Sequence, residues 1–168
     1  MRPYLGYLSI VPSDVFLIRH AMAVNASVDV RGPQRHLTDL GREQARALGD
    51  RLRWHDCEPT HIWSSPLVRA MQTAELVAAG VHATCAIETV EGLAPGNEPI
   101  RIVEALAKLP DDALVMLFGH EPLIAMIGGL LTGTADFPAI DRAEAVRIHG
   151  NRVRWRFMWD ADAPTPNF

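Results

Sequence analysis

Three short polar groups in the sequence directly follow apolar runs: Arg19-His20, Ser64-Ser65 with Arg69 close behind, and Gly119-His120. Guanidinium groups bind phosphate oxygens through paired hydrogen bonds and stay charged at any working pH. A neutral imidazole among them has three conceivable roles: nucleophile towards phosphorus, general base, or metal ligand. A metal would need a third or fourth ligand at suitable spacing, and no acidic residue is adjacent to His20. We therefore expect a phosphoryl-binding site without a metal.

The segments that precede these groups predict the strands that would position them. Residues 15–18 and 113–118 are uninterrupted apolar runs typical of buried strands in a parallel sheet, and Thr60-His61-Ile62-Trp63 is predicted to be a short strand. Helical periodicity, with Ser65 as the cap of the second segment, predicts helices at 38–54, 66–80, 99–109 and 122–133. Such alternation brings the carboxyl ends of parallel strands to one edge of a sheet, where ligands bind. The sequence thus predicts an α/β fold in which the polar groups converge.

Two weaker patterns complete the prediction. Residues 83–87 indicate a minor strand, and 143–149 with 152–159 indicate a hairpin around Gly150-Asn151. In the second arm of the hairpin, apolar residues alternate with cationic ones, so one face would carry Arg152, Arg154 and Arg156. This face is either solvated or a docking surface for an acidic partner.

Composition limits the class of protein. A chain of 168 residues, 48% hydrophobic and 21% charged, fits one soluble globular domain. Its net charge of −4 argues against a nucleic acid or an anionic membrane as the main partner. Cys57 and Cys85 cannot form a disulfide framework and lack metal-ligand spacing, which fits a cytoplasmic location. Residues 1–13 are expected to be an N-terminal extension, without the features of a signal peptide, and no run is long enough to span a membrane.

Read in order, these residues resemble the histidine phosphatase superfamily, whose hallmark is Arg-His-Gly at the end of the first strand. The resemblance covers residues 14–160 and is greatest to the short SixA-like phosphohistidine phosphatases. It runs through Leu17-Ile18-Arg19-His20-Ala21, then Arg35-His36-Leu37-Thr38 with Gly41, then Ser64-Ser65-Pro66-Leu67-Val68-Arg69-Ala70-Met71-Gln72-Thr73-Ala74. It continues through Leu93-Ala94-Pro95-Gly96 to Gly119-His120-Glu121-Pro122.

The resemblance implies a three-layer α/β/α sandwich with a mostly parallel sheet, formed by a single domain over residues 14–168. It implies His20 as the nucleophile that becomes phosphorylated, with Arg19, Arg69 and His120 binding the phosphoryl oxygens. Arg35 resembles a further arginine that short members supply from the loop before the first helix. The family uses neither a cofactor nor a metal.

Two departures from the family pattern concern the pocket. Ala21 replaces the hallmark glycine, which adds a methyl group near the site. Larger members carry an acidic proton donor in an insertion that this chain lacks. Glu91 is the nearest candidate by position and, with Ser65, a candidate substrate-binding residue; Glu121 stands at a helix start, where a carboxylate is favoured electrostatically anyway.

The predicted function is a phosphatase that works through a phosphohistidine intermediate. The preferred substrate is phosphohistidine on a protein, followed by small phosphate esters. One alternative is a general phosphomonoesterase. A second, from another class, is a non-catalytic phosphate-binding adaptor domain, but the presence of His20 favours an enzyme. The physiological substrate and the oligomeric state do not follow from the sequence.

Overall fold

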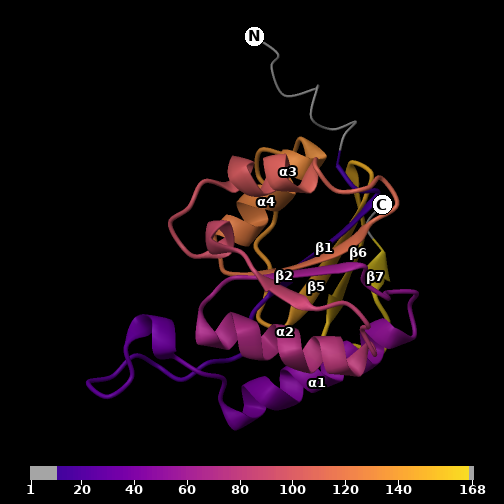
Figure 1. Ribbon diagram of the computed structural model, residues 1–168. Helices are drawn as coiled ribbons and strands as arrows, with labels where there is room; N and C mark the ends of the chain where they lie inside the picture. Colours follow the sequence, from indigo (N-terminus) through magenta and orange to yellow (C-terminus); the bar gives the residue numbers. More distant parts are fainter. Residues whose placement is uncertain (1–10, 167–168) are drawn as a thin grey trace.

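Seven strands form one sheet with the spatial order β3-β2-β4-β1-β5-β6-β7 in a computed structural model that describes residues 11–166 (Figure 1). The strands are β1 (Asp14–Arg19), β2 (His61–Ser64), β3 (Ile87–Thr89), β4 (Leu114–Gly119), β5 (Glu144–His149), β6 (Arg152–Met158) and β7 (Thr165–Pro166). The pairs β3-β2, β2-β4 and β4-β1 are parallel, whereas β5, β6 and β7 pair antiparallel. The parallel half contains all three strands that end in the predicted polar groups.

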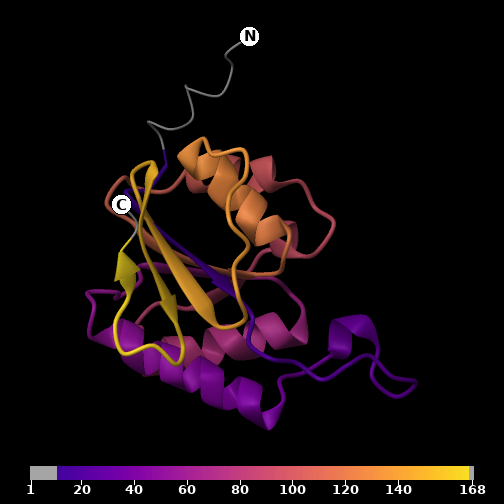
Figure 2. The same ribbon diagram turned by 180° about the vertical axis from the view of Figure 1, so that it is seen from behind.

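Within residues 11–166, four α-helices cover the two faces of the sheet (Figures 1 and 2). The helices α1 (Asp39–Arg53) and α2 (Val68–Gly80) lie on one face, and α3 (Pro99–Leu106) and α4 (Leu123–Thr132) lie on the other. Two short 3₁₀ helices, η1 (Gly32–Gln34) and η2 (Glu91–Leu93), lie in loops. Each face of the sheet has its own apolar cluster, because alternate residues of β1 and β4 point to opposite sides. The predicted three-layer α/β/α fold is confirmed.

The central strands β1 and β4 determine where the polar groups lie. Residues 15–18 and 115–118 are almost fully buried, as their apolar runs predict. Parallel pairing aligns Arg19 with Gly119, and the His20 amide then donates to Gly119 O at 3.1 Å. The two strands therefore end at the same level of the sheet, one residue before each histidine.

Helices α1 and α2 cross in close contact. A Cβ atom added to Gly80 would lie 2.7 Å from Gly49 Cα, and one added to Gly49 would lie 3.0 Å from Val77 O. Real Cβ atoms essentially never come as close to backbone as a side chain at Gly80 would, so Gly80 is needed for the helices to approach this closely. A side chain at Gly49 would be tight and would require the backbone of α2 to shift by a few tenths of an ångström. The crossing fixes α2, and with it Arg69 in its first turn, relative to α1.

Several predicted boundaries were wrong by a few residues. The third strand is Ile87–Thr89 and not 83–87, because α2 runs to Gly80 and the chain then turns. Helix α2 begins at Val68 with Leu67 at its N-cap, although the Ser65 hydroxyl still accepts a hydrogen bond from the Leu67 amide at 3.3 Å. Helix α3 ends at Leu106, after which hydrogen-bonded turns continue towards Pro110.

The C-terminal hairpin is confirmed as β5 and β6, but only part of its cationic face is exposed to solvent. Arg156 is half-buried, and its Nε donates to Glu144 Oε1 at 2.7 Å, while Arg152 and Arg154 are exposed. Most of the predicted extension 1–13 lies outside the described residues; within it, Val11 packs against the apolar cluster beneath α3 and α4. No helix within residues 11–166 is both long and apolar enough to cross a membrane.

Candidate active site

The carboxyl ends of β1, β2 and β4 bring together the residues predicted to bind a phosphoryl group. The imidazole rings of His20 and His120 lie with their centroids 5.0 Å apart. Arg69, 49 positions further along the chain than His20, donates from its Nε to His20 Nε2 at 3.3 Å. Both histidines and Arg69 are more than nine-tenths buried. Arg19 is the last residue of β1 and precedes His20 directly.

Hydrogen bonds fix the tautomer of His20. Its Nδ1 lies 2.7 Å from Ala21 O, and because a carbonyl oxygen can only accept, Nδ1 must carry the proton. The neutral ring then has its lone pair on Nε2, which agrees with donation from Arg69 to that atom. Nε2 is therefore the unprotonated nitrogen of the ring, and it lies beside the Arg69 guanidinium.

His120 is held by Ser65. Its Nε2 is hydrogen-bonded to the Ser65 hydroxyl at 2.8 Å, and that hydroxyl also accepts from the Leu67 amide. The Ser65 proton is thus available to donate to Nε2, in which case His120 carries its own proton on Nδ1. Ser65, predicted to contact substrate, is thus hydrogen-bonded to one of the two histidines of the site.

Two buried polar atoms of this site have no hydrogen-bond partner within the described part of the chain: Arg19 Nε and His120 Nδ1. Buried polar atoms are nearly always paired in proteins, so an unpartnered one needs an explanation. Both atoms belong to side chains that can donate to an anion, and they come from adjacent strand ends.

Arg35 contributes a further positive charge. Its Nε donates to Val24 O at 2.7 Å, which is a contact within the loop before α1. Arg69 Nη1 donates to Gly32 O at 3.0 Å and so ties this loop to the site. Burial, and then the charge of Arg35, lower the pKa of the Arg69 guanidinium. Among residues 11–166, none of Arg19, Arg35 and Arg69 forms an ion pair with a carboxylate.

Burial, together with this concentration of positive charge, keeps both imidazoles neutral. Burial, followed by the charges of Arg69 and Arg19, lowers the pKa of His20 to about 4, against the opposing effect of its hydrogen bond to Ala21. Burial, followed by His20 and Arg69, lowers the pKa of His120 to about 3. Unpaired positive charge around two neutral imidazoles favours the binding of a multiply charged anion.

Two residues that position or surround the site were not predicted. Thr73 is fully buried; its hydroxyl accepts from the Ala21 amide at 3.1 Å and donates to Arg69 O at 2.7 Å. Arg142, which precedes β5, is exposed, and its charge is a further cause of the lowered pKa of His20. Thr73 lies one helical turn after Arg69, which is a usable sequence signal, whereas nothing local marks Arg142.

The departures from the family pattern have structural outcomes. The Ala21 side chain is fully buried in a small apolar cluster with Leu37, Ala45 and Ala143, so its methyl group packs into the protein. Glu91 is exposed in η2, and no hydrogen bond or ion pair links its carboxylate to either histidine. Glu121 Oε1 accepts from the Ile140 amide at 3.0 Å and so holds the segment before β5.

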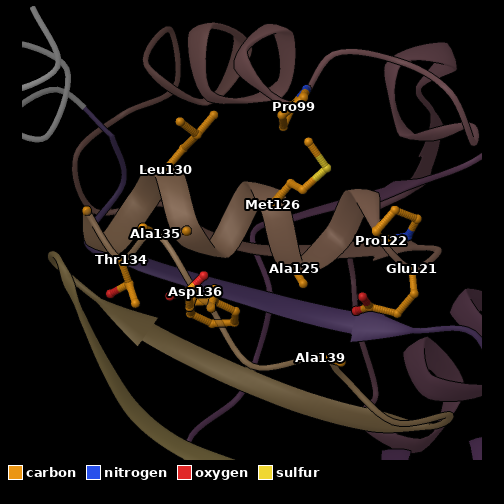
Figure 3. Close-up of a pocket in the computed structure, with 13 residues that line it drawn as sticks. Pro99, Glu121, Pro122, Ala125, Met126, Leu130, Thr134, Ala135, Asp136 and Ala139 are labelled. Atoms are coloured by element: carbon orange, nitrogen blue, oxygen red, sulfur yellow. The ribbon is translucent and has the colours of Figure 1, made fainter.

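An apolar groove of about 820 Å³ begins beside the site, between α4 and the chain that follows it (Figure 3). Glu121 and Ala139 lie at its end near the histidines, and Met126 and Leu130 lie along α4. The groove contains none of the residues that converge on His20. In the part of the chain that the structure describes, no three His, Cys, Asp or Glu side chains are grouped so that they could hold a metal ion.

Comparison with known proteins identifies the family. Residues 15–95 match the model of the histidine phosphatase superfamily, branch 1. An uncharacterized protein from Picosynechococcus sp. is 30% identical over 114 residues, which are 65% of this chain and 67% of that protein. The chain belongs to the histidine phosphatase superfamily. Its predicted assignment as a phosphatase enzyme is confirmed at that level.

Other similarities are partial or concern the fold. The mitochondrial serine/threonine-protein phosphatase Pgam5 of Caenorhabditis briggsae is 41% identical over 64 residues, which are 38% of this chain; the chain spans about a fifth of that protein, 21%. The protein histidine phosphatase SixA, in a structure complexed with tungstate, superimposes with a TM-score of 0.80 at 23% identity, covering 87% of this chain and 97% of that one. At this identity the agreement shows a shared fold.

Proposed function

We propose that the protein is a phosphohistidine phosphatase that transfers the phosphoryl group of its substrate to His20 Nε2 and then to water. The observation that carries this proposal is the tautomer of His20: Nδ1 donates to Ala21 O, and Nε2 faces Arg69 with its lone pair. Because the pKa of His20 is lowered to about 4, Nε2 carries no proton at neutral pH.

In the first half of the reaction, His20 Nε2 attacks phosphorus. The N–P bond forms as the bond from phosphorus to the leaving group breaks, and the ring becomes positively charged because Nδ1 keeps its proton. The hydrogen bond to Ala21 O stabilises that charge. Arg19, Arg69 and His120 would bind the phosphoryl oxygens, where fixed donors stabilise the negative charge of the transition state.

In the second half, water attacks phosphorus, the P–Nε2 bond breaks, and the water proton leaves with the phosphate or to solvent. Free His20 is restored with its proton still on Nδ1. The same donors bind the phosphoryl oxygens in both halves. Dividing one displacement into two is the general advantage of a nucleophilic residue.

The choice of substrate follows from the leaving group. An alkyl phosphate must expel an alkoxide, which requires a positioned acid typically worth about 10²–10⁴ in rate. Within the described chain, no carboxylate is hydrogen-bonded to His20 or His120. Phosphohistidine instead expels imidazole, whose conjugate acid has a pKa of about 6.5, and solvent can protonate its second nitrogen. A site without a positioned acid therefore favours phosphohistidine.

The decisive experiment traps the intermediate. Rapid quenching with a ³²P-labelled phosphohistidine peptide should give an adduct that is stable in alkali and labile in acid, on the peptide that contains His20. His20→Ala should give no adduct and no turnover, while retaining the affinity for tungstate expected from the structural similarity to SixA. An adduct on Ser64 or Ser65, or turnover by His20→Ala, would contradict the mechanism. Binding of phosphate without turnover by the wild-type protein would indicate an adaptor domain.

A further inference from the structure

The segment 139–143, which leads into β5, is attached directly to the end of β1. The Ala143 amide donates to Arg19 O at 3.1 Å, and Arg19 Nη1 donates to Ile140 O at 3.0 Å. From the other side, Glu121 Oε1 accepts from the Ile140 amide. Arg19, which precedes His20, and Glu121, which follows His120, thus hold this segment in place.

The turn within the segment is unusual. Ala143 has a φ of 54° and is fully buried. The left-handed conformation is unfavourable for a non-glycine residue, and such strain gathers at functional sites. The turn is closed on its other side by Glu144, whose Oε2 accepts from the Asp141 amide at 2.7 Å and whose carboxylate is in turn paired with Arg156.

Arg142 stands at the outer corner of this turn. Its side chain is exposed, and among residues 11–166 it has no hydrogen bond or ion pair, even though Asp141 precedes it. Its backbone is fixed by the contacts on both sides, and its charge is near enough to lower the pKa of His20. Arg142 is therefore a positively charged side chain on a rigid turn at the rim of the site.

We propose that Arg142 is a specificity-determining residue that binds a carboxylate of the substrate, next to the phosphoryl group. This inference rests on the proposed function. The phosphoryl oxygens face the buried donors of Arg19, Arg69 and His120, so an exposed guanidinium outside them meets the remainder of the substrate. A carboxylate suits it because it is an unpaired cation beside a site that already holds the unpaired charges of Arg19, Arg35 and Arg69, and an acidic side chain beside the phosphorylated residue of a protein would supply one.

The contact would be at the solvent-exposed edge of the site, where an ion pair changes an equilibrium by about fivefold at most. We therefore expect wild-type protein to prefer a phosphohistidine peptide with Glu on both sides of the modified residue over its Gln counterpart, by about two- to fivefold in kcat/KM. The preference should be lost in Arg142→Gln. Free phosphohistidine and its carboxamide form a second pair, which distinguishes a small-molecule carboxylate from one on a protein.

Arg152→Gln is the matched control, because it removes the same charge from an exposed position at the opposite end of the β5-β6 hairpin. It should keep the preference. The proposal would be overturned if Arg142→Gln kept the preference for the Glu-flanked peptide. It would also be overturned if Arg152→Gln lost that preference equally, because the preference would then depend only on the net charge of the protein.

A binding measurement separates this inference from the proposed function. Calorimetric titration with 3-phosphonopropionate and with its amide needs no turnover. The wild-type protein should bind the carboxylate more tightly, and Arg142→Gln should bind both alike. If the wild-type protein shows this difference but hydrolyses neither peptide, the role of Arg142 stands and the substrate class is wrong. If it binds both compounds equally, Arg142 has no such role.

Discussion

His120 Nε2 and the Ser65 hydroxyl, which come from the ends of neighbouring strands β4 and β2, share a hydrogen bond of 2.8 Å. The bond lies in a fully buried region, and the same hydroxyl accepts from the Leu67 amide. Ser65 therefore links the segment that leads into α2 to His120 and orients the imidazole ring of His120.

Replacing Ser65 by alanine should leave His120 Nε2 unpaired and the ring free to rotate. An unsatisfied buried group costs about 1–3 kcal/mol, so we expect phosphate or tungstate to bind roughly tenfold more weakly, with kcat/KM falling by at least as much. Ser64→Ala is the control, since that buried hydroxyl donates to Ser65 O and does not touch His120. Equal affinity for the anion in both variants would show that Ser65 does not position His120.

Arg69 should depend on the shape of its guanidinium as well as on its charge. Loss of one fixed donor to a transition state costs about 10²–10³ in rate, and we expect that loss in Arg69→Ala. Arg69→Lys keeps the charge but not the planar fork, so it should recover only part of the activity. Arg42→Lys, at an exposed position of α1, should match the wild type in kcat/KM. A loss of less than about threefold in Arg69→Ala would rule out the proposed contact with the phosphoryl group.

Acidification should destabilise the protein through the two histidines. Their pKa values are about 4 and about 3 when folded, against 6.5 for the free side chain. Below pH 6.5 the unfolded chain therefore binds protons that the folded chain does not, until the folded pKa values are reached. Stability should be full above that pH and fall as the pH drops towards 4, with a slope approaching about 1.4 kcal/mol per pH unit for each histidine.

Urea denaturation across this pH range measures the effect. His20→Gln removes one titrating group and should flatten the dependence of unfolding free energy on pH. The control is His82→Asn, because His82 is exposed and has a φ of 57°, which asparagine tolerates. If His20→Gln retains the wild-type slope, His20 does not titrate as its surroundings imply.

Glu91 should be dispensable for phosphohistidine. Its carboxylate is exposed and has no hydrogen bond or ion pair to His20 or His120, so Glu91→Gln should hydrolyse a phosphohistidine peptide at close to the wild-type rate. Wild-type kcat/KM for that peptide should exceed that for an alkyl phosphate by at least about tenfold, because the alkyl ester lacks a good leaving group. Glu104→Gln on the exposed side of α3 is the control. Similar rates on both substrates, with Glu91→Gln slowed on the ester alone, would identify a phosphomonoesterase with Glu91 as its acid.

The convergence of Arg19, His20 and His120 could be predicted because each follows a long apolar run. Such a run identifies a buried parallel strand, and its last residue fixes which edge of the sheet the next side chain reaches. Arg142 could not be predicted in this way. It comes from the turn before an antiparallel strand, and the pairing of β5 with β1 brings that turn next to Arg19.

The minor strand was misplaced for a related reason. Ile87–Thr89 has two exposed residues and pairs only with β2 at the edge of the sheet, so little burial constrains its apolar pattern. The contact between Ser65 and His120 could not be predicted from the sequence either. Each residue alone is compatible with a direct role towards substrate, and only the distance between them shows that one holds the other.

The glycine pair at the crossing of α1 and α2 affects how tolerance to mutation should be interpreted in this protein. Gly80 lies at the opposite end of α2 from Arg69 and takes no part in the site, yet any side chain there must separate the helices. A selection of random variants for enzymatic activity should therefore reject substitutions at Gly80 strictly, and those at Gly49 to a lesser degree. Mutational intolerance alone would place these two glycines among the functional residues, although neither comes near the phosphoryl group.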